Sequence, residues 1–264
     1  MISSEKKFLF VRIPKTAGTT IQTAISRGQF IDLDSFGAQI QFCKEGDASW
    51  ARDAKTVKNK SKYINFFDFA VRPDSFIHAC YQDWEEAYDL NGYFSFSFVR
   101  NPWEWVVSQY LFLRRVYLRR LNNERRGRPS RKRYFANRRE DFSKKLSNFG
   151  LSYEEFRLNQ ELLSFESYVE AYFSEDSFNK TQSSFLKNKE GEIAVDFIGK
   201  FENLQSDWEF IAKKINSEQI PLKDTNSSGD RSSYDSYYES AEIKKIVTNG
   251  LAEDIERFGY EFGD

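Results

Sequence analysis

Two short segments combine a cation with hydroxyls or backbone features that suit phosphate. The first contains Lys15 and Gly18 and ends in the paired hydroxyls of Thr19 and Thr20. Glycine lets a backbone approach an anion closely, and the N–H groups at the start of a helix attract negative charge. If a strand precedes this segment and a helix follows it, the segment should bind a phosphate, with Lys15 as a mobile charge at its mouth.

The second segment is Arg100, followed directly by Asn101 and Pro102. An arginine fork makes charge-assisted contacts to phosphate. Asn at the N-cap and Pro in the first turn favour a helix that starts here. Ser108 then lies about two turns along that helix and could donate a further hydrogen bond. We therefore expect a second phosphate contact at this point.

The surrounding residues predict the elements that position these segments. The apolar run 8–13 and the aromatic run 93–99 read as buried strands, with a third strand at 193–201. Helices are expected from Thr19, from Asn101, and at about 160–173, 204–215 and 240–258. This alternation predicts an α/β fold: a P-loop-like central parallel sheet flanked by helices, in a single domain over 1–264.

One stretch of the chain is strongly basic although the net charge of all 264 residues is −1. Fourteen basic residues against three acidic ones leave an excess of +11 between 114 and 145. We expect a basic, helical insertion at about 114–150 that would attract a polyanion, first of all an acidic polysaccharide. Nucleic acid is disfavoured because no recognised nucleic-acid fold accompanies the stretch. A lid or an oligomer contact stays open.

Composition also bears on location and cofactors. The two cysteines, Cys43 and Cys80, are expected to be reduced thiols. The N-terminal apolar run leads straight into the first loop and does not resemble a signal peptide. No stretch of about 18 apolar residues predicts a membrane span, so we expect a cytoplasmic protein. No His, Cys and Asp cluster has ligand spacing, so no metal is expected.

The segment Val11–Thr20 resembles the 5′-phosphosulfate loop of sulfotransferases that use 3′-phosphoadenosine 5′-phosphosulfate (PAPS). It is most similar to carbohydrate sulfotransferases and their bacterial relatives, and departs from them with Arg12 for His and Thr20 for Ser. The segment 96–102 with Ser108 resembles the 3′-phosphate site of that family. Similar stretches lie at 195–204, 226–238 and 254–260, so the resemblance spans about 8–262 and fails over 114–150.

This resemblance implies PAPS as co-substrate and a hydroxyl acceptor, most simply on a carbohydrate. His78, the one histidine, stands 22 residues before Arg100 and matches the place of the general base in the bacterial relatives. Asp83 or Glu85 is the fallback base. Lys15 is expected to act in catalysis as well as in binding. The residues expected to bind the nucleotide are Lys15, Thr16, Ala17, Gly18, Thr19, Thr20, Arg100, Ser108, Ser228 and Arg231.

Two other functions compete with this one. A P-loop phosphotransferase would need Mg²⁺ ligands and a Walker-type loop with Lys directly before the helix, whereas here Lys15 precedes Gly18. A non-catalytic module that binds a nucleotide or a polyanion would not need Lys15, His78, Arg100 and Ser108 together. Both alternatives are therefore disfavoured.

Overall fold

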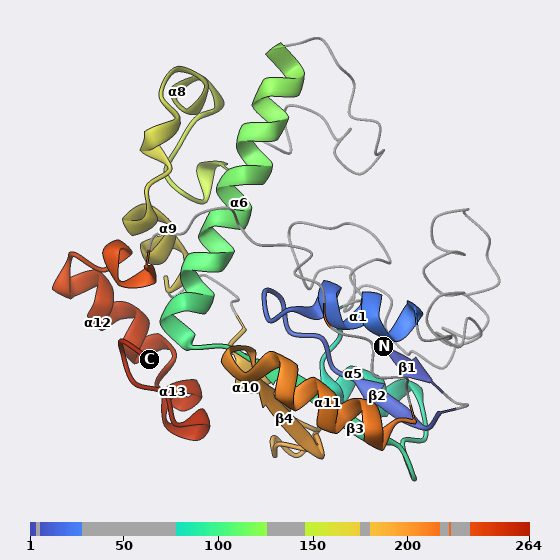
Figure 1. The fold of residues 1–264 in the computed structure, drawn as a ribbon. Coiled ribbons are helices and arrows are strands. Elements are labelled where there is room, and N and C mark those ends of the chain that lie inside the picture. The colour runs from blue at the N-terminus through green and yellow to red at the C-terminus, as the bar shows by residue number, and fades with distance from the viewer. Residues whose placement is uncertain (4–5, 28–77, 126–145, 175–179, 217–221, 223–232) are drawn as a thin grey trace. The chain divides into compact units, whose positions relative to one another are not determined.

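The computed structural model describes residues 1–3, 6–27, 78–125, 146–174, 180–216, 222 and 233–264. These residues form two compact units (Figure 1). The first unit comprises Met1–Arg100 and Lys180–Ser227, and the second comprises Asn101–Asn179 and Ser228–Asp264. The first contains the sheet and is described before the second.

The described part of the first unit contains a four-stranded sheet in the order β1-β2-β3-β4. Its strands are Ile2–Ser3, Phe8–Phe10, Phe94–Val99 and Phe197–Lys200. β2, β3 and β4 run parallel, as predicted, but β1 pairs antiparallel with β2, so the sheet is mixed rather than all-parallel. The sequence analysis missed β1 because two residues are too short to show an alternating pattern.

Two of the predicted strands are shorter than expected. β2 ends at Phe10, although Val11 N still donates to Phe96 O at 2.9 Å. The stretch expected to be a strand from Ile193 pairs in the sheet only from Phe197; before that, Ile193 forms an isolated antiparallel bridge with Lys187. The apolar residues therefore predicted that these strands exist, but they did not predict where the strands begin and end.

The aromatic and serine alternation of β3 has a physical explanation. Phe96 and Phe98 are fully buried, and so are Ser95 and Ser97, so both faces of the strand are covered. Buried hydroxyls need partners: Ser97 Oγ donates to Val11 O at 2.7 Å, and Ser95 Oγ donates to the Asp196 carboxylate at 2.6 Å. The two serines thus bond to the segments on either side of their strand.

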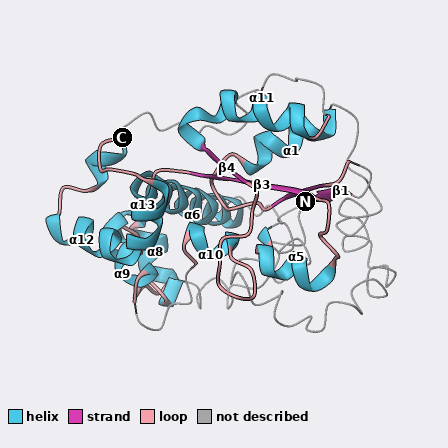
Figure 2. Cartoon of the chain, turned by 90° about the horizontal axis from the view of Figure 1, so that it is seen from below, coloured by secondary structure: helices cyan, strands magenta, loops and turns pink. Residues whose placement is uncertain are grey.

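Helices cover both faces of this sheet, as predicted. Figure 2 shows α1 and α11 on one side and α5 and α10 on the other. Their bounds are Gly18–Arg27, Leu204–Lys214, Tyr81–Ala87 and Gln182–Leu186, and a 3₁₀ turn at Phe201–Asn203 precedes α11. An α/β fold is confirmed.

The described residues of the second unit are helical. Asn101 caps α6 as predicted, because its Oδ1 accepts from the backbone N–H of Trp103 at 3.1 Å and of Glu104 at 3.3 Å. The helices are α6 at Pro102–Arg125, α8 at Tyr153–Leu158, α9 at Phe165–Tyr172, α12 at Ala241–Gly250 and α13 at Ala252–Phe258, with 3₁₀ turns at Gln160–Leu162 and Tyr234–Tyr237.

Two expectations for this unit need correction. The helix expected at 240–258 is two helices, broken at Leu251, whose φ of −118° and ψ of 22° are not helical. The helix expected from 160 starts at Phe165, because Ser164 caps it by accepting from Ser167 N at 3.1 Å. A short polar side chain sets the boundary at Ser164, whereas the break at Leu251 has no side-chain cap. The apolar spacing runs across both boundaries.

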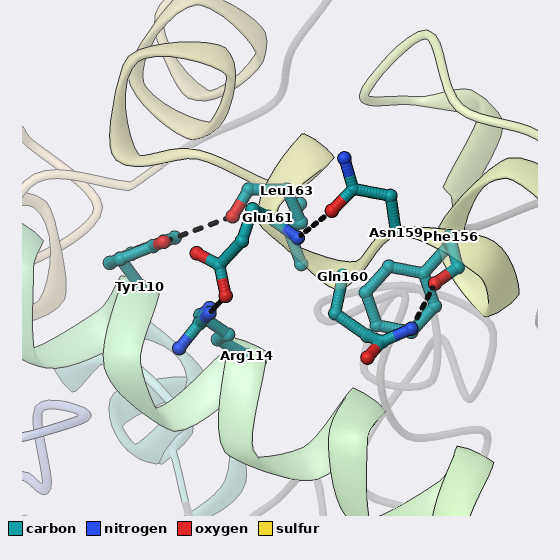
Figure 3. Close-up of polar contacts among 7 residues, drawn as sticks. All are labelled: Tyr110, Arg114, Phe156, Asn159, Gln160, Glu161 and Leu163. Carbon is teal, nitrogen blue, oxygen red and sulfur yellow. Dashed lines mark hydrogen bonds and ion pairs between the residues drawn. The ribbon is translucent and has the colours of Figure 1, made fainter.

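Polar contacts join α6 to the turn at 160–162 (Figure 3). Tyr110 Oη donates to Leu163 O at 2.9 Å, and Arg114 Nη2 lies 2.6 Å from Glu161 Oε1. α6 also contains the start of the predicted basic insertion, so residues 114–125 are helical. Residues 126–145 lie outside the described part, so the rest of the insertion stays a prediction. No described helix has the length and apolar character to cross a membrane.

The contact between β3 and β4 predicts the effect of one methyl group. A Cβ on Gly199 would lie 2.6 Å from Phe98 Cε1, so Gly199→Ala should destabilise the fold by about 1–3 kcal/mol. The same substitution in a Phe98→Leu background should have a smaller effect, because the opposing ring is gone. Urea unfolding of the four proteins measures this, and equal penalties in both backgrounds would contradict it.

Candidate active site

The loop between β2 and α1 has an unusual backbone. Lys15 has φ of 67° and Ala17 has φ of 63°, both in the left-handed region. This conformation is uncommon for residues with a side chain and is found mostly where a function requires it. Left-handed residues that alternate with right-handed ones can turn successive N–H groups toward one point and form an anion-binding concavity. The positive φ values of Lys15 and Ala17 are compatible with such a concavity.

The side chains of the loop divide into internal and outward-facing ones. Thr16 is fully buried, and its Oγ1 donates to Ile13 O at 3.1 Å. Its hydroxyl therefore closes the loop, and Thr16 can serve an anion only through its backbone N–H. Thr20 is also buried, whereas Thr19 is exposed at the start of α1. The first-turn N–H groups of α1 have no acceptor within the helix and add to the anion site.

Arg100 lies at the carboxyl end of β3 and reaches the same loop. Its Nη1 donates to Lys15 O at 3.4 Å, and its guanidinium lies 4.2 Å from the centre of the Phe201 ring. Two cationic residues expected to bind phosphate, Lys15 and Arg100, are thus neighbours although 85 residues separate them. The aromatic face limits where the guanidinium can move and orients its fork.

The buried side chain of Gln182 holds the backbone of Arg100, a role that the sequence analysis missed. Arg100 N donates to Gln182 Oε1 and Gln182 Nε2 donates to Arg100 O, both at 2.8 Å. Gln182 is fully buried at the start of α10. Thr181 caps that helix, which a sequence can suggest, but no local signal reveals that the amide of Gln182 pairs with a peptide 82 residues away.

His78 lies just before α5 and contacts the residue that leads into the loop. Its Nδ1 is 2.9 Å from Arg12 O. A carbonyl can only accept, so Nδ1 carries the proton and Nε2 of the neutral ring is an acceptor. Burial, with a smaller contribution from the charge of Arg12, lowers the pKa of His78 to about 3. The ring is therefore neutral at pH 7, with Nε2 able to accept a proton.

The residues near His78 have structural contacts. The Asp83 carboxylate accepts from Cys80 N at 2.8 Å at the start of α5, and Glu85 Oε2 accepts from Lys189 N at 3.3 Å. The Cys80 thiol is buried, which raises its pKa to about 11, and Lys180 Nζ lies 2.9 Å from its sulfur. The thiol is thus protonated at neutral pH, and Cys80 is a free cysteine, as expected from the sequence.

The described part of the first unit does not include three of the predicted binding residues. Ser108 belongs to the second unit, half-buried on α6. Ser228 and Arg231 lie outside the described residues. The residues that the first unit brings together are Lys15, Thr16, Ala17, Gly18, Thr19, Thr20, His78 and Arg100.

Comparison with known protein families identifies the family of this chain. Residues 1–261 match the sulfotransferase family. The chain belongs to that family. A similar protein from Archaeoglobus fulgidus, described as uncharacterized, is 32% identical over 127 residues, which cover 48% of this chain and 70% of the relative. No solved structure gives a significant match to this sulfotransferase.

The buried state of His78 predicts a pH-dependent stability. The unfolded chain binds a proton at His78 below pH about 6.5, whereas the folded chain does so only near pH 3. The stabilisation is therefore fully present above pH 6.5 and declines as pH falls through this window. Because there is one histidine, its NMR titration is unambiguous, and urea unfolding of His78→Gln should show a weaker slope with pH. An apparent pKa near 6.5 in the folded protein would contradict this.

The clamp on Arg100 predicts a second effect. Gln182→Met keeps the volume but removes the side-chain partner of the part-buried Arg100 N–H and C=O, which should destabilise the fold by about 2 kcal/mol or more. Gln205→Met is the matched control, because Gln205 is exposed on α11 and its side chain donates to Glu209 Oε1 at 2.9 Å. Urea unfolding of both variants tests this, and similar small losses would argue against the clamp.

Proposed function

We propose that this sulfotransferase moves a sulfuryl group from PAPS to a hydroxyl of an acceptor, and that the acceptor is a carbohydrate or polysaccharide. The observation that carries the proposal is the contact between Arg100 and the carbonyl of Lys15. It joins an arginine fork to a loop in which Lys15 and Ala17 have left-handed backbone conformations. A nucleotide with phosphates at two positions needs two such anion sites at a fixed separation.

The proposed roles in donor binding follow from the chemistry of each group. The backbone N–H groups of 16–20 and the first turn of α1 would hold the 5′-phosphate. Arg100 and Ser108 would hold the 3′-phosphate and so fix the orientation of the donor. Ser228 and Arg231 would contribute from the later loop that resembles the family's nucleotide-covering segment.

The proposed transfer needs one base and one stabilising cation. The acceptor oxygen attacks sulfur in line while Nε2 of His78 takes its proton. The bond from sulfur to the bridging oxygen of the 5′-phosphate breaks, and Lys15 stabilises the charge that grows on this oxygen. The products are the sulfated acceptor, 3′-phosphoadenosine 5′-phosphate (PAP) and the proton. No metal takes part in this scheme.

The low pKa of His78 fits a base that is tuned by its substrate. The charges that lower it include Arg12 and Lys15, after burial. A bound donor brings negative charge to the loop, which offsets these cations and raises the proton affinity of the ring. His78 would thus be neutral before binding and a stronger base once the donor is bound.

A phosphotransferase is supported less well. In a Walker loop the lysine stands directly before the helix, whereas here α1 begins at Gly18 and Lys15 lies within the loop, in a left-handed conformation. A non-catalytic nucleotide or polyanion module would not need a histidine whose ring is oriented beside the loop by the contact of Nδ1 with Arg12 O. The carbohydrate class rests on the resemblance and on the basic residues after Arg114, which would attract an anionic chain.

The proposal predicts different effects for the base and the anchor. His78→Gln can keep the bond to Arg12 O but loses the base, so kcat for transfer of ³⁵S from labelled PAPS to a glycan panel should fall about 10²–10⁴-fold with PAP affinity retained. Arg100→Ala should weaken PAP binding instead. Arg257→Ala is the matched control, since Arg257 pairs with Glu253 on the exposed side of α13.

Thermal unfolding provides the comparison with the alternatives. PAP should raise the unfolding temperature more than ATP with Mg²⁺, because a ligand stabilises the state that binds it. Greater stabilisation by ATP with Mg²⁺ would favour the phosphotransferase. PAP binding without transfer to any glycan, including anionic ones, would favour the binding module.

A further inference from the structure

Arg12, one of the two positions at which the segment departs from the sulfotransferase loop that it resembles, contacts the start of α1. Its Nη2 donates to Thr19 Oγ1 at 2.7 Å and its Nη1 donates to Gln22 Oε1 at 2.6 Å. Both acceptors lie in the first turns of α1. The guanidinium therefore ties the end of β2 to the start of the helix that bounds the anion site.

The side chain of Arg12 passes directly under Gly18. A Cβ on Gly18 would lie 2.3 Å from Arg12 Nε and 2.6 Å from its Cγ. The absence of a side chain at Gly18 thus leaves the space that the Arg12 side chain occupies.

Among the described residues, no carboxylate lowers the cost of burying the charge of Arg12. Its Nε is buried without a hydrogen-bond partner among the described residues. Burial lowers the pKa of the guanidinium to about 10, and no carboxylate in the described part of the chain offsets this. The group still carries its charge at neutral pH, and a buried charge without a counter-ion favours an anion nearby.

Arg12 also acts on its two neighbours at the site. A guanidinium only donates hydrogen bonds, so Thr19 Oγ1 accepts in their contact and the hydroxyl proton is turned away from Arg12. Through its backbone, the same residue accepts from His78 Nδ1 at 2.9 Å. One residue therefore contacts both the anion-binding turn and the expected base.

We propose that Arg12 is a positioning residue that couples donor binding to the base: its guanidinium seats Thr19 and charges the loop, and its carbonyl orients His78. This inference rests on the proposed function. It assigns to Arg12 a role in the affinity for the donor nucleotide and in the protonation of His78. The other charged groups that act on His78 are Lys15 and the amino terminus, both cationic, so the charge of Arg12 is part of a common positive field.

The test compares Arg12→Gln, which removes the charge, with Arg12→Lys, which keeps it but loses the fork. PAP affinity, measured by calorimetry, should fall about tenfold or more in Arg12→Gln and less in Arg12→Lys.

The pH dependence of kcat/KM provides the second measurement. Its acidic limb, where activity is lost because the base becomes protonated, should move to higher pH in Arg12→Gln alone, because loss of the cation raises the pKa of the base. The NMR titration of His78 should move in the same direction. Arg257→Gln, on exposed α13, is the control.

A purely structural role for Arg12 gives a different result. Both variants would then lose stability alike, with PAP affinity and the acidic limb unchanged, and this would overturn the inference while the proposed function stands. If Arg12→Gln fails to fold, Gln22→Met tests the contacts of the guanidinium, because it removes one acceptor and keeps the charge of Arg12. PAP affinity should then fall, and the acidic limb of kcat/KM should stay at the same pH. Unchanged affinity in both Arg12→Lys and Gln22→Met would overturn the inference. A wild-type protein that binds neither PAP nor PAPS would overturn both proposals.

Discussion

The parallel pairing of β2 with β3 is the constraint on which the candidate site depends. Phe10 lies opposite Phe96, and the backbone of Val11 extends this pairing by one further bond. Because the two strands run the same way, their carboxyl ends reach one edge of the sheet, where the loop and Arg100 both begin. A shift of the register by one residue would turn every side chain to the opposite face and separate Arg100 from Lys15.

Buried polar contacts fix the segments that leave this edge. Thr16 bonds within the loop, Gln182 bonds to both backbone groups of Arg100, and Ser97 bonds to Val11 O. Buried polar groups are costly when they lose their partners, so each contact favours one arrangement over alternatives. The backbone at this edge is thus held by buried and part-buried polar contacts, and the Arg100 side chain adds its own contacts to Lys15 O and Phe201.

The sequence revealed those features that depend on neighbouring residues. The loop at 14–18, the cap at Asn101 and the three parallel strands follow from local chemistry, and they are present in the structure. Features set by distant pairings could not be predicted. The clamp by Gln182 joins residues 82 apart, the low pKa of His78 comes from burial, and the contacts of Arg12 depend on how α1 turns back over β2. The catalytic and binding roles stay predictions, as do those of Ser108, Ser228 and Arg231.

The left-handed backbone at Lys15 and Ala17 has a consequence for how stability and affinity are balanced in this chain. An alanine held at φ of 63° is strained compared with glycine, and this strain is present before any ligand arrives. A loop already held in this conformation would capture an anion with little further loss of backbone entropy. Selection for a more stable protein and selection for a tighter anion site would therefore favour different residues at position 17.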